Sequence, residues 1–169
     1  GIIQSIQQIV SRKQNPLDPV VVSVTKIESG TAFNIIPQNA NFIGTIRTLN
    51  PKTRSLVKEQ FIDICNSTAT VYGCNAKVKI SEGYPVTINT SAESDIAIEV
   101  AKKTVKTKAI KDNLAPSMGA EDFAYMLEKK PGAYIWLGAG EGKSGCMLHN
   151  SRYDFNDEII PLGISYWYN

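Results

Sequence analysis

Apolar and polar residues follow two different periods in the first half of the chain, and these periods predict helices and strands. Apolar residues recur every three or four positions over residues 1–12, which predicts an amphipathic helix. The stretch "NPLDP" at 15–19 ends this helix, because two prolines so close together cannot continue it. In "VVVSVTKI", residues 20–27, Val20, Val22 and Val24 share one face, as in a strand.

A second strand, a helix and a third strand are predicted after an irregular crossing. The second strand spans 39–49, where Gly44 indicates a bulge or a close approach of another backbone. Asn50 caps the helix, which has proline at its first position and ends at Gly73. "AKVKI" at 76–80 alternates apolar residues with lysines and predicts an amphipathic strand.

The order of these elements predicts an α/β fold of a known kind. One further strand before Gly1 would complete a βαββαβ unit, in which two helices cover one face of an antiparallel sheet to form an open-faced sandwich. The chain starts at Gly1 inside a helical pattern and without Met. We therefore expect it to be a piece of a longer protein.

The second half has a different character. Thr90 and Glu93 form a capping box at the start of a helix that continues to about residue 105. Residues 118–130 predict a loop that leads into a short helix. The continuous apolar run "AYIWLGAG", 133–140, predicts a strand covered on both faces. Residues 155–169 predict a terminal helix, capped by Asn156 or Asp157.

Composition and charge narrow the possible functions. The chain is 43% hydrophobic and 20% charged, which is ordinary for a globular protein. A net charge of +2 without a basic stripe argues against nucleic-acid binding, and no apolar run is long enough to cross a membrane. Residues 1–89 carry a net charge of +4 and residues 90–169 a net charge of −2, which indicates a boundary near residue 90.

The three cysteines have no metal-type spacing. Buried or half-buried free thiols in a reducing cytoplasm explain them best, so we expect a cytoplasmic protein and no catalytic thiol. The cysteines are Cys65, Cys74 and Cys146.

His149 is the single histidine of the chain and the first candidate for chemistry. It follows a glycine-rich stretch, 138–145, which comes directly after the predicted buried strand, so it would lie at a carboxyl edge where α/β sheets bind ligands. Neutral imidazole is a good ligand for zinc or manganese, but one ligand does not make a site. A structural role therefore stays open, and the nearby carboxylates have no diagnostic spacing. These carboxylates are Glu121, Asp122, Asp154 and Asp157.

Arg47 and Asn34 form a second candidate site. Arg47 lies in the uncharged stretch "FIGTIRTL", and its planar guanidinium suits bidentate binding of a carboxylate, to which Asn34 could add an amide hydrogen bond. A solvated sheet arginine and a turn-forming asparagine would account for the same residues equally well.

Gly119 precedes the short helix in "PSMGAEDF" and forms a third candidate site. A glycine in this position exposes backbone N–H groups that could point at a carbonyl or carboxylate oxygen. Glu121 and Asp122 could instead complement the helix dipole, which is the simpler role for Asp122.

Four ordered motifs, taken together, resemble one family across essentially the whole chain. They resemble the metal-dependent N-acyl-amino-acid amidohydrolases of the hippurate hydrolase, aminoacylase and carboxypeptidase G group. "QIVSRKQNPLDP" at the end of the first helix fits as well. The four motifs are "GTAFNIIPQNANFIGTIRTL", "PSMGAEDFAYML", "PGAYIWLGAG" and "LHNSRYDFNDEIIPLG".

The resemblance implies a two-domain enzyme. Residues 1–89 would be most of a lid and dimerisation domain that lacks its first strand, and 90–169 would be the C-terminal segment of a zinc-peptidase-like catalytic domain. The parent enzyme would bind two divalent metals (zinc, manganese or cobalt), act on a small N-acyl amino acid or dipeptide, and form a homodimer through the lid.

The resemblance also implies roles for individual residues. His149 matches a metal ligand, Asn34 and Arg47 match residues that grip the substrate carboxylate, and Gly119 matches a loop that lines the substrate pocket. The other metal ligands and the general base would lie outside this chain, so the chain alone should be inactive. Without the rest of the domain, the run 133–138 should be exposed. A non-catalytic dimerisation or peptide-binding module remains the alternative.

Overall fold

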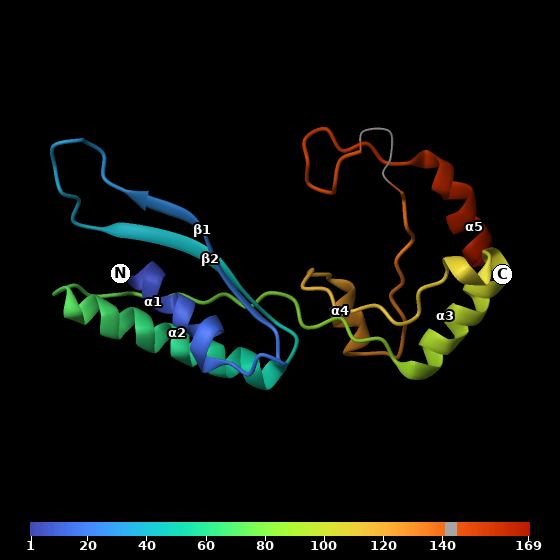
Figure 1. The fold of residues 1–169 in the computed structure, drawn as a ribbon, viewed down its shortest axis with the longest axis horizontal. Coiled ribbons are helices and arrows are strands. Elements are labelled where there is room, and N and C mark those ends of the chain that lie inside the picture. Colours follow the sequence, from blue (N-terminus) through green and yellow to red (C-terminus); the bar gives the residue numbers. More distant parts are fainter. Residues whose placement is uncertain (141–144) are drawn as a thin grey trace. The chain divides into compact units, whose positions relative to one another are not determined.

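The computed structural model describes residues 1–140 and 145–169, and the chain divides into two compact units (Figure 1). The N-terminal unit comprises Gly1–Val86 with Pro116–Gly119, and the C-terminal unit comprises Thr87–Ala115 with Ala120–Asn169. None of the helices in these described ranges is both long and apolar enough to cross a membrane.

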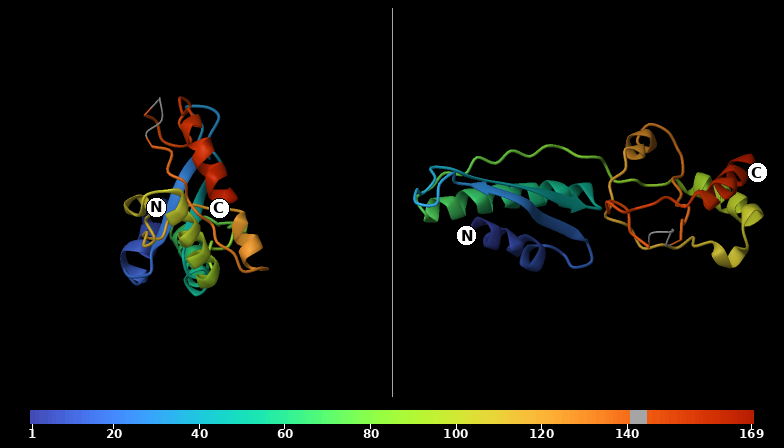
Figure 2. Two further views of the ribbon diagram at one scale, coloured as in Figure 1. Left: turned by 90° about the vertical axis from the view of Figure 1, so that its right-hand side faces the viewer. Right: turned by 90° about the horizontal axis from the view of Figure 1, so that it is seen from above.

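The N-terminal unit packs three helical segments against a β-hairpin (Figures 1 and 2). The strands β1 and β2 form a two-stranded antiparallel sheet, and the described residues contain no further paired strand. The elements are α1 (Ile2–Gln8), the π-helical turn η1 (Ile9–Lys13), β1 (Val20–Ser29), β2 (Ala40–Thr48) and α2 (Pro51–Val71).

The core of this unit lies between the hairpin and the helices. Ile6, Ile9 and Val57 are completely buried, and the inward side chains of both strands pack against them, which confirms the face predicted for β1. The side chains that pack from the strands are Val20, Val22, Val24, Phe42 and Ile46. Residues on the other face of the hairpin are not covered by these helices.

Gly44 allows the two strands to approach closely. The pairing register shifts between Val24 and Lys26, opposite Gly44, as in a β-bulge. A Cβ atom on Gly44 would lie 2.1 Å from the carbonyl oxygen of Ser23, which is impossible without moving the backbone. The bulge and close approach predicted at this glycine are confirmed.

The ends of α2 are those that the sequence predicts. The Asn50 side chain accepts a hydrogen bond from the Lys52 N–H at 2.9 Å, and Pro51 occupies the first turn. Gly73 has a φ of +66° and donates its N–H to the Thr70 carbonyl at 3.0 Å, closing the helix. Cys65 is buried in α2, whereas Cys74 is exposed, so the expectation of a covered thiol is wrong for Cys74.

The strand predicted at 76–80 does not form among the described residues. The alternation is present, because Ala76 and Val78 pack against the core while Lys77 and Lys79 are exposed. The segment runs beside α2 and has no paired neighbour (Figure 1). An alternating pattern specifies which face is buried, but a strand also needs a hydrogen-bonding partner.

The C-terminal unit is mostly helix and irregular chain. Its longest helix is α3, and Thr90 occupies the predicted N-cap position. The predicted capping box does not form, because the Thr90 hydroxyl donates to the Glu93 carboxylate and the Thr90 N–H donates to the Gly132 carbonyl. The side chain of Asn156 caps the terminal helical segment by accepting from the Glu158 N–H at 3.1 Å. The elements are α3 (Ser91–Thr104), η2 (Thr107–Ala109), α4 (Phe123–Leu127), η3 (Asp157–Ile159) and α5 (Ile160–Tyr168).

The prediction of a doubly covered strand at 133–140 is wrong for this chain. The segment forms no paired strand, and Ile135, Trp136 and Leu137 are 39%, 67% and 42% exposed. The side chain of Asn89 substitutes for a neighbouring strand, since it accepts from the Tyr134 N–H at 2.8 Å and donates to the Tyr134 carbonyl at 2.9 Å. The exposure is that expected when no neighbouring strands cover the run.

Candidate functional site

Arg47 lies near the end of β2, on the face of the hairpin that the helices leave uncovered. Its neighbour Ile46 packs into the core, so the alternation of the strand directs Arg47 outwards, where it is exposed. The guanidinium Nη1 donates a hydrogen bond of 2.7 Å to the carbonyl oxygen of Met118. This bond brings Arg47 together with the segment that contains Gly119.

Gly119 ends the Pro116–Gly119 segment of the N-terminal unit. Its N–H donates to the Ser117 Oγ at 3.1 Å, so this N–H is occupied and not free to meet a ligand, which corrects that part of the expectation. Its φ is not in the left-handed region, and an added Cβ would meet the Ser117 Oγ at an ordinary 3.4 Å. Neither the backbone nor the neighbouring residues therefore require a glycine at this position.

Asn34 is not brought near Arg47. It is exposed in the loop between β1 and β2, whereas Arg47 lies near the end of β2 that is far from this loop. From Ala40, where β2 leaves this loop, to Arg47 the strand rises about 23 Å at roughly 3.3 Å per residue. The two side chains of one chain cannot bind the same small carboxylate.

His149 lies in an exposed turn of the C-terminal unit. Its φ of +68° is unusual for a residue other than glycine, and the turn is closed by a 3.2 Å hydrogen bond from the Asn150 N–H to the Met147 carbonyl. Within residues 1–140 and 145–169, no three His, Cys, Asp or Glu side chains gather in a way that could hold a metal. Part of the glycine-rich stretch at 138–145, residues 141–144, lies outside the described residues.

Glu121 has a structural partner. It precedes α4 and accepts a 2.8 Å hydrogen bond from the hydroxyl of Tyr134. That bond, together with a second one involving Asp122, lowers the pKa of Glu121, and the bond to Glu121 raises the pKa of Tyr134. Of the other two carboxylates, Asp157 begins η3, and Asp154 lies in the segment before it.

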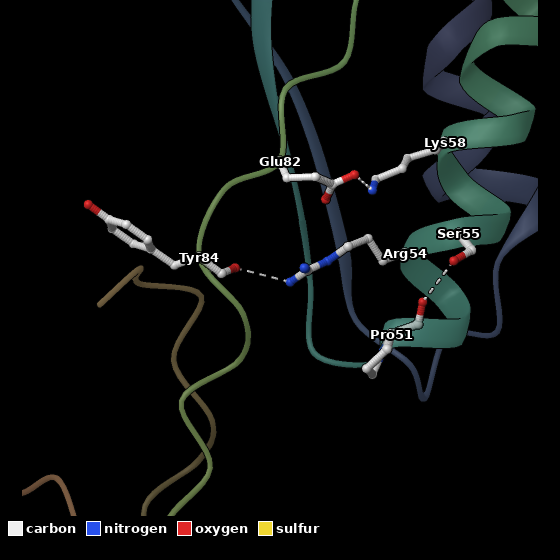
Figure 3. Close-up of polar contacts among 6 residues, drawn as sticks. All are labelled: Pro51, Arg54, Ser55, Lys58, Glu82 and Tyr84. Carbon is white, nitrogen blue, oxygen red and sulfur yellow. Dashed lines mark hydrogen bonds and ion pairs between the residues drawn. The ribbon is translucent and has the colours of Figure 1, made fainter. Parts of the chain in front are cut away.

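Side chains of α2 hold the segment by which the chain leaves the N-terminal unit (Figure 3). Arg54 Nη2 donates to the Tyr84 carbonyl at 3.3 Å, and Lys58 forms an ion pair with Glu82. The Lys58 ammonium lowers the pKa of Glu82.

Sequence reasoning missed Arg54, Lys58 and Glu82 as residues that hold this segment, and it also missed Ser117. For Ser117 a signal existed, because a serine two residues before a glycine favours a side-chain turn.

Two solved structures share the fold of this chain. The fold matches that of a putative aminohydrolase from methicillin-resistant Staphylococcus aureus, with a TM-score of 0.75 and 20% identity over 98% of this chain. It also matches a dinuclear metal-binding peptidase of the M20 family from Bacillus subtilis, with a TM-score of 0.72 and 27% identity over 99% of this chain and 43% of that one.

The sequence places the chain in a family. Residues 4–169 match the model of peptidase family M20/M25/M40, and the chain belongs to this family. It is 37% identical to thermostable carboxypeptidase 2 of Saccharolobus solfataricus over 96% of its length, and 37% identical to hippurate hydrolase of Campylobacter jejuni over 98%. An N-acetyldiaminopimelate deacetylase of Anoxybacillus flavithermus is 33% identical over 97% of the chain.

The chain spans less than half of these relatives. It covers 41% of the carboxypeptidase, 43% of the hippurate hydrolase and 42% of the deacetylase. The match to the family model confirms, at the level of the family, the resemblance inferred from the four motifs. The activity of a whole protein, its substrate and its partners are matters for proposal.

Proposed function

We propose that this chain supplies a carboxylate-binding group and a metal ligand to a metal-dependent amidohydrolase that hydrolyses the amide bond of N-acyl or aryl-acyl amino acids. The observation that carries the proposal is Arg47, an exposed guanidinium on the uncovered face of the hairpin, fixed at one nitrogen to Met118. Its remaining N–H groups suit bidentate binding of a carboxylate. The names of two relatives point to such substrates, since hippurate and N-acetyldiaminopimelate are N-acyl amino acids.

His149 is the candidate metal ligand. An exposed imidazole held in a left-handed turn suits a ligand, because such a conformation costs energy and persists more often at functional positions. The described residues contain no group of three possible ligands, so further ligands would come from the part of the relatives' length that this chain does not span. Divalent metal ions supply Lewis-acid polarisation of the amide carbonyl in enzymes of this kind.

The other residues would select and orient the substrate. Arg47 would bind the α-carboxylate and so fix the distance from the carboxylate to the amide. Neither the backbone conformation nor a neighbouring residue requires a glycine at position 119. The absence of a side chain there would leave space for the substrate beside the guanidinium. Asn34 lies too far along the hairpin to help the Arg47 of its own chain. We therefore propose that Asn34 serves a second protomer of a homodimer formed by residues 1–89, with 90–169 contributing to the catalytic domain.

Arg47→Ala tests the carboxylate role. We make this substitution in a protein completed with the part of the family's length that this chain lacks. There we expect KM for an N-acyl amino acid to rise about ten- to a hundredfold, because a hydrogen-bonded charge partner contributes about 1.5–3 kcal/mol. KM for the corresponding amide should change little. Arg54→Ala is the matched control, since Arg54 also donates to a backbone carbonyl. Equal effects of Arg47→Ala on acid and amide would rule out the role.

His149→Asn tests the metal role without disturbing the turn, because asparagine tolerates a positive φ. In the same completed protein, we expect the bound metal per protomer, measured by elemental analysis after dialysis, to fall by about one equivalent, as expected when one ligand of a site is lost. Metal content equal to that of the unsubstituted protein would exclude His149 as a ligand.

A pure pairing module is the second candidate, and one observation favours it. The loop between β1 and β2 exposes large apolar side chains, with Phe33 104%, Ile35 65% and Ile36 95% exposed. Such a patch is typical of a protein–protein interface. The two candidates differ in one respect, because a pairing module needs neither Arg47 nor His149. A completed protein whose protomers still associate, but which hydrolyses no N-acyl amino acid, would favour the pairing module.

A further inference from the structure

The Pro116–Gly119 segment contains two hydrogen bonds in series that end at Arg47. The Ser117 Oγ accepts from the Gly119 N–H at 3.1 Å, which closes a turn around Met118. The carbonyl oxygen of Met118 then accepts from Arg47 Nη1 at 2.7 Å, the shorter of the two bonds. The serine hydroxyl is therefore linked to the guanidinium through one peptide group.

These two hydrogen bonds matter because neither the backbone at Gly119 nor the side chain of Arg47 is rigid by itself. Gly119 has no Cβ, so its backbone is freer than that of other residues unless a hydrogen bond restrains it. Arg47 is exposed, and a free arginine side chain samples many rotamers. A guanidinium is planar, so fixing Nη1 on a carbonyl restricts the plane in which its other donors, Nε and Nη2, can meet a carboxylate.

We propose that Ser117 is a positioning residue for Arg47. By holding the turn closed, its hydroxyl keeps the Met118 carbonyl where it orders the guanidinium before a substrate carboxylate arrives. The rotamer entropy of Arg47 is then lost on folding and not on binding, which tightens binding of the carboxylate. This inference rests on the proposed function, in which Arg47 binds that group.

The first test reads the order of Arg47 directly and needs neither substrate nor catalysis. In the 169-residue chain, the NMR order parameter of the Arg47 Nε–H should be about 0.8 and should fall below about 0.6 in Ser117→Ala. Ser117→Thr keeps a hydroxyl at the same position and should restore the value. An unchanged order parameter in Ser117→Ala would overturn the proposal.

Ser55→Ala is the matched control. Ser55 is also exposed, lies in the same unit, and donates its hydroxyl to the Pro51 carbonyl at 3.3 Å on α2 (Figure 3). It has no link to Arg47, so its loss should leave the Arg47 order parameter unchanged. A fall equal to that of Ser117→Ala would show a general loosening of the unit and would overturn the positioning role.

The second test separates this inference from the proposed function. In the completed enzyme, Ser117→Ala should raise KM for an N-acyl amino acid about tenfold, leave kcat within about twofold and spare the amide substrate, while Ser117→Thr should act like serine. If Arg47→Ala raises KM but Ser117→Ala does not, the positioning role fails and the proposed function stands. If Arg47→Ala has no effect on KM, the proposed function fails, whatever Ser117 does to the order parameter.

Discussion

Ile9, in the turn after α1, is completely buried, whereas Ile164 in α5 is 65% exposed, and this contrast holds for the two units as a whole. The N-terminal unit buries six apolar side chains, and both of its strands pack on them. In the described part of the C-terminal unit, Ala124 is the one apolar residue that is buried to the same degree. The six are Ile6, Ile9, Val20, Val57, Cys65 and Ala69.

The difference shows which kind of interaction holds each unit. A buried core stabilises through the area that it removes from water, at about 25 cal/mol per Å². The C-terminal unit relies more on polar contacts between segments that are distant in the sequence. Thr90 exchanges hydrogen bonds with Gly132 at 2.9 and 3.0 Å, Asn89 binds Tyr134, and Tyr166 donates to the Ala97 carbonyl at 3.2 Å. We expect substitutions to affect the two units through different mechanisms.

The largest expected effect is that of Ile9→Ala. Removing a completely buried isoleucine should destabilise the N-terminal unit by about 2–5 kcal/mol, because a cavity remains. Ile164→Ala, in a largely exposed position, should change stability by less than about 0.5 kcal/mol. Urea unfolding measures the difference, and thiol labelling of buried Cys65 reports on this unit alone. Equal effects of the two substitutions would remove the contrast between the units.

Gly44→Ala should have the next largest effect. The new Cβ would lie 2.1 Å from the Ser23 carbonyl, and the strands would have to separate, at about 1–3 kcal/mol. Gly83→Ala is the control, since a Cβ there meets nothing within 4 Å. Hydrogen exchange of the β1 and β2 amides should accelerate for Gly44→Ala only. If both variants exchange at the same rate, close strand approach is not important for this unit.

Asn89→Ala tests the polar contacts of the other unit. Losing both hydrogen bonds to Tyr134 should cost about 1–2 kcal/mol and expose the Tyr134 amide to exchange. The exchange of amides in α2 should stay as it was, since α2 belongs to the other unit. Slower or unchanged exchange at Tyr134 would show that the side chain does not replace a neighbouring strand.

The smallest expected effect is a pH dependence within the C-terminal unit. The hydrogen bond from Tyr134 lowers the pKa of Glu121, so its contribution is present above the ordinary glutamate pKa and is lost as pH falls through the folded value. Tyr134→Phe should move the pKa of Glu121 back towards its ordinary value, measured by NMR titration of the side-chain carboxyl. A titration that is identical in both proteins would mean that the bond does not persist in solution.

Local signals predicted much of the fold. The caps at Asn50 and Asn156 and the end of α2 at Gly73 were predicted correctly, because each depends on a hydrogen bond or a dihedral angle within a few residues. Thr90 was predicted at the right position, but not its hydrogen bonds to Gly132, which is distant in the sequence. Gly44 was also predicted, since a glycine inside a strand usually marks a bulge or a close backbone approach. The alternation at 76–80 gave the buried face but not the pairing, which depends on another segment.

The candidate site was only partly predictable. Sequence reasoning selected Arg47 and Gly119 separately, but not Ser117 or the bond to Met118, because residues 71 positions apart are brought together only by folding. It also grouped Asn34 with Arg47, although the hairpin separates them. The roles of His149, Asn34, Arg47 and Gly119 stay predictions, and the experiments above test them.

The sequence by itself determined the family, the caps at Asn50 and Asn156, and the inward faces of β1 and of residues 76–80, since all of these depend on residue type and short-range spacing. The tertiary structure decided that the apolar run 133–138 is left exposed and that the Met118 carbonyl is the hydrogen-bond partner of Arg47. It also decided that Asn34 lies at the opposite end of the hairpin from Arg47. These features depend on contacts between distant segments, and the period of a pattern does not specify which segment will be the neighbour.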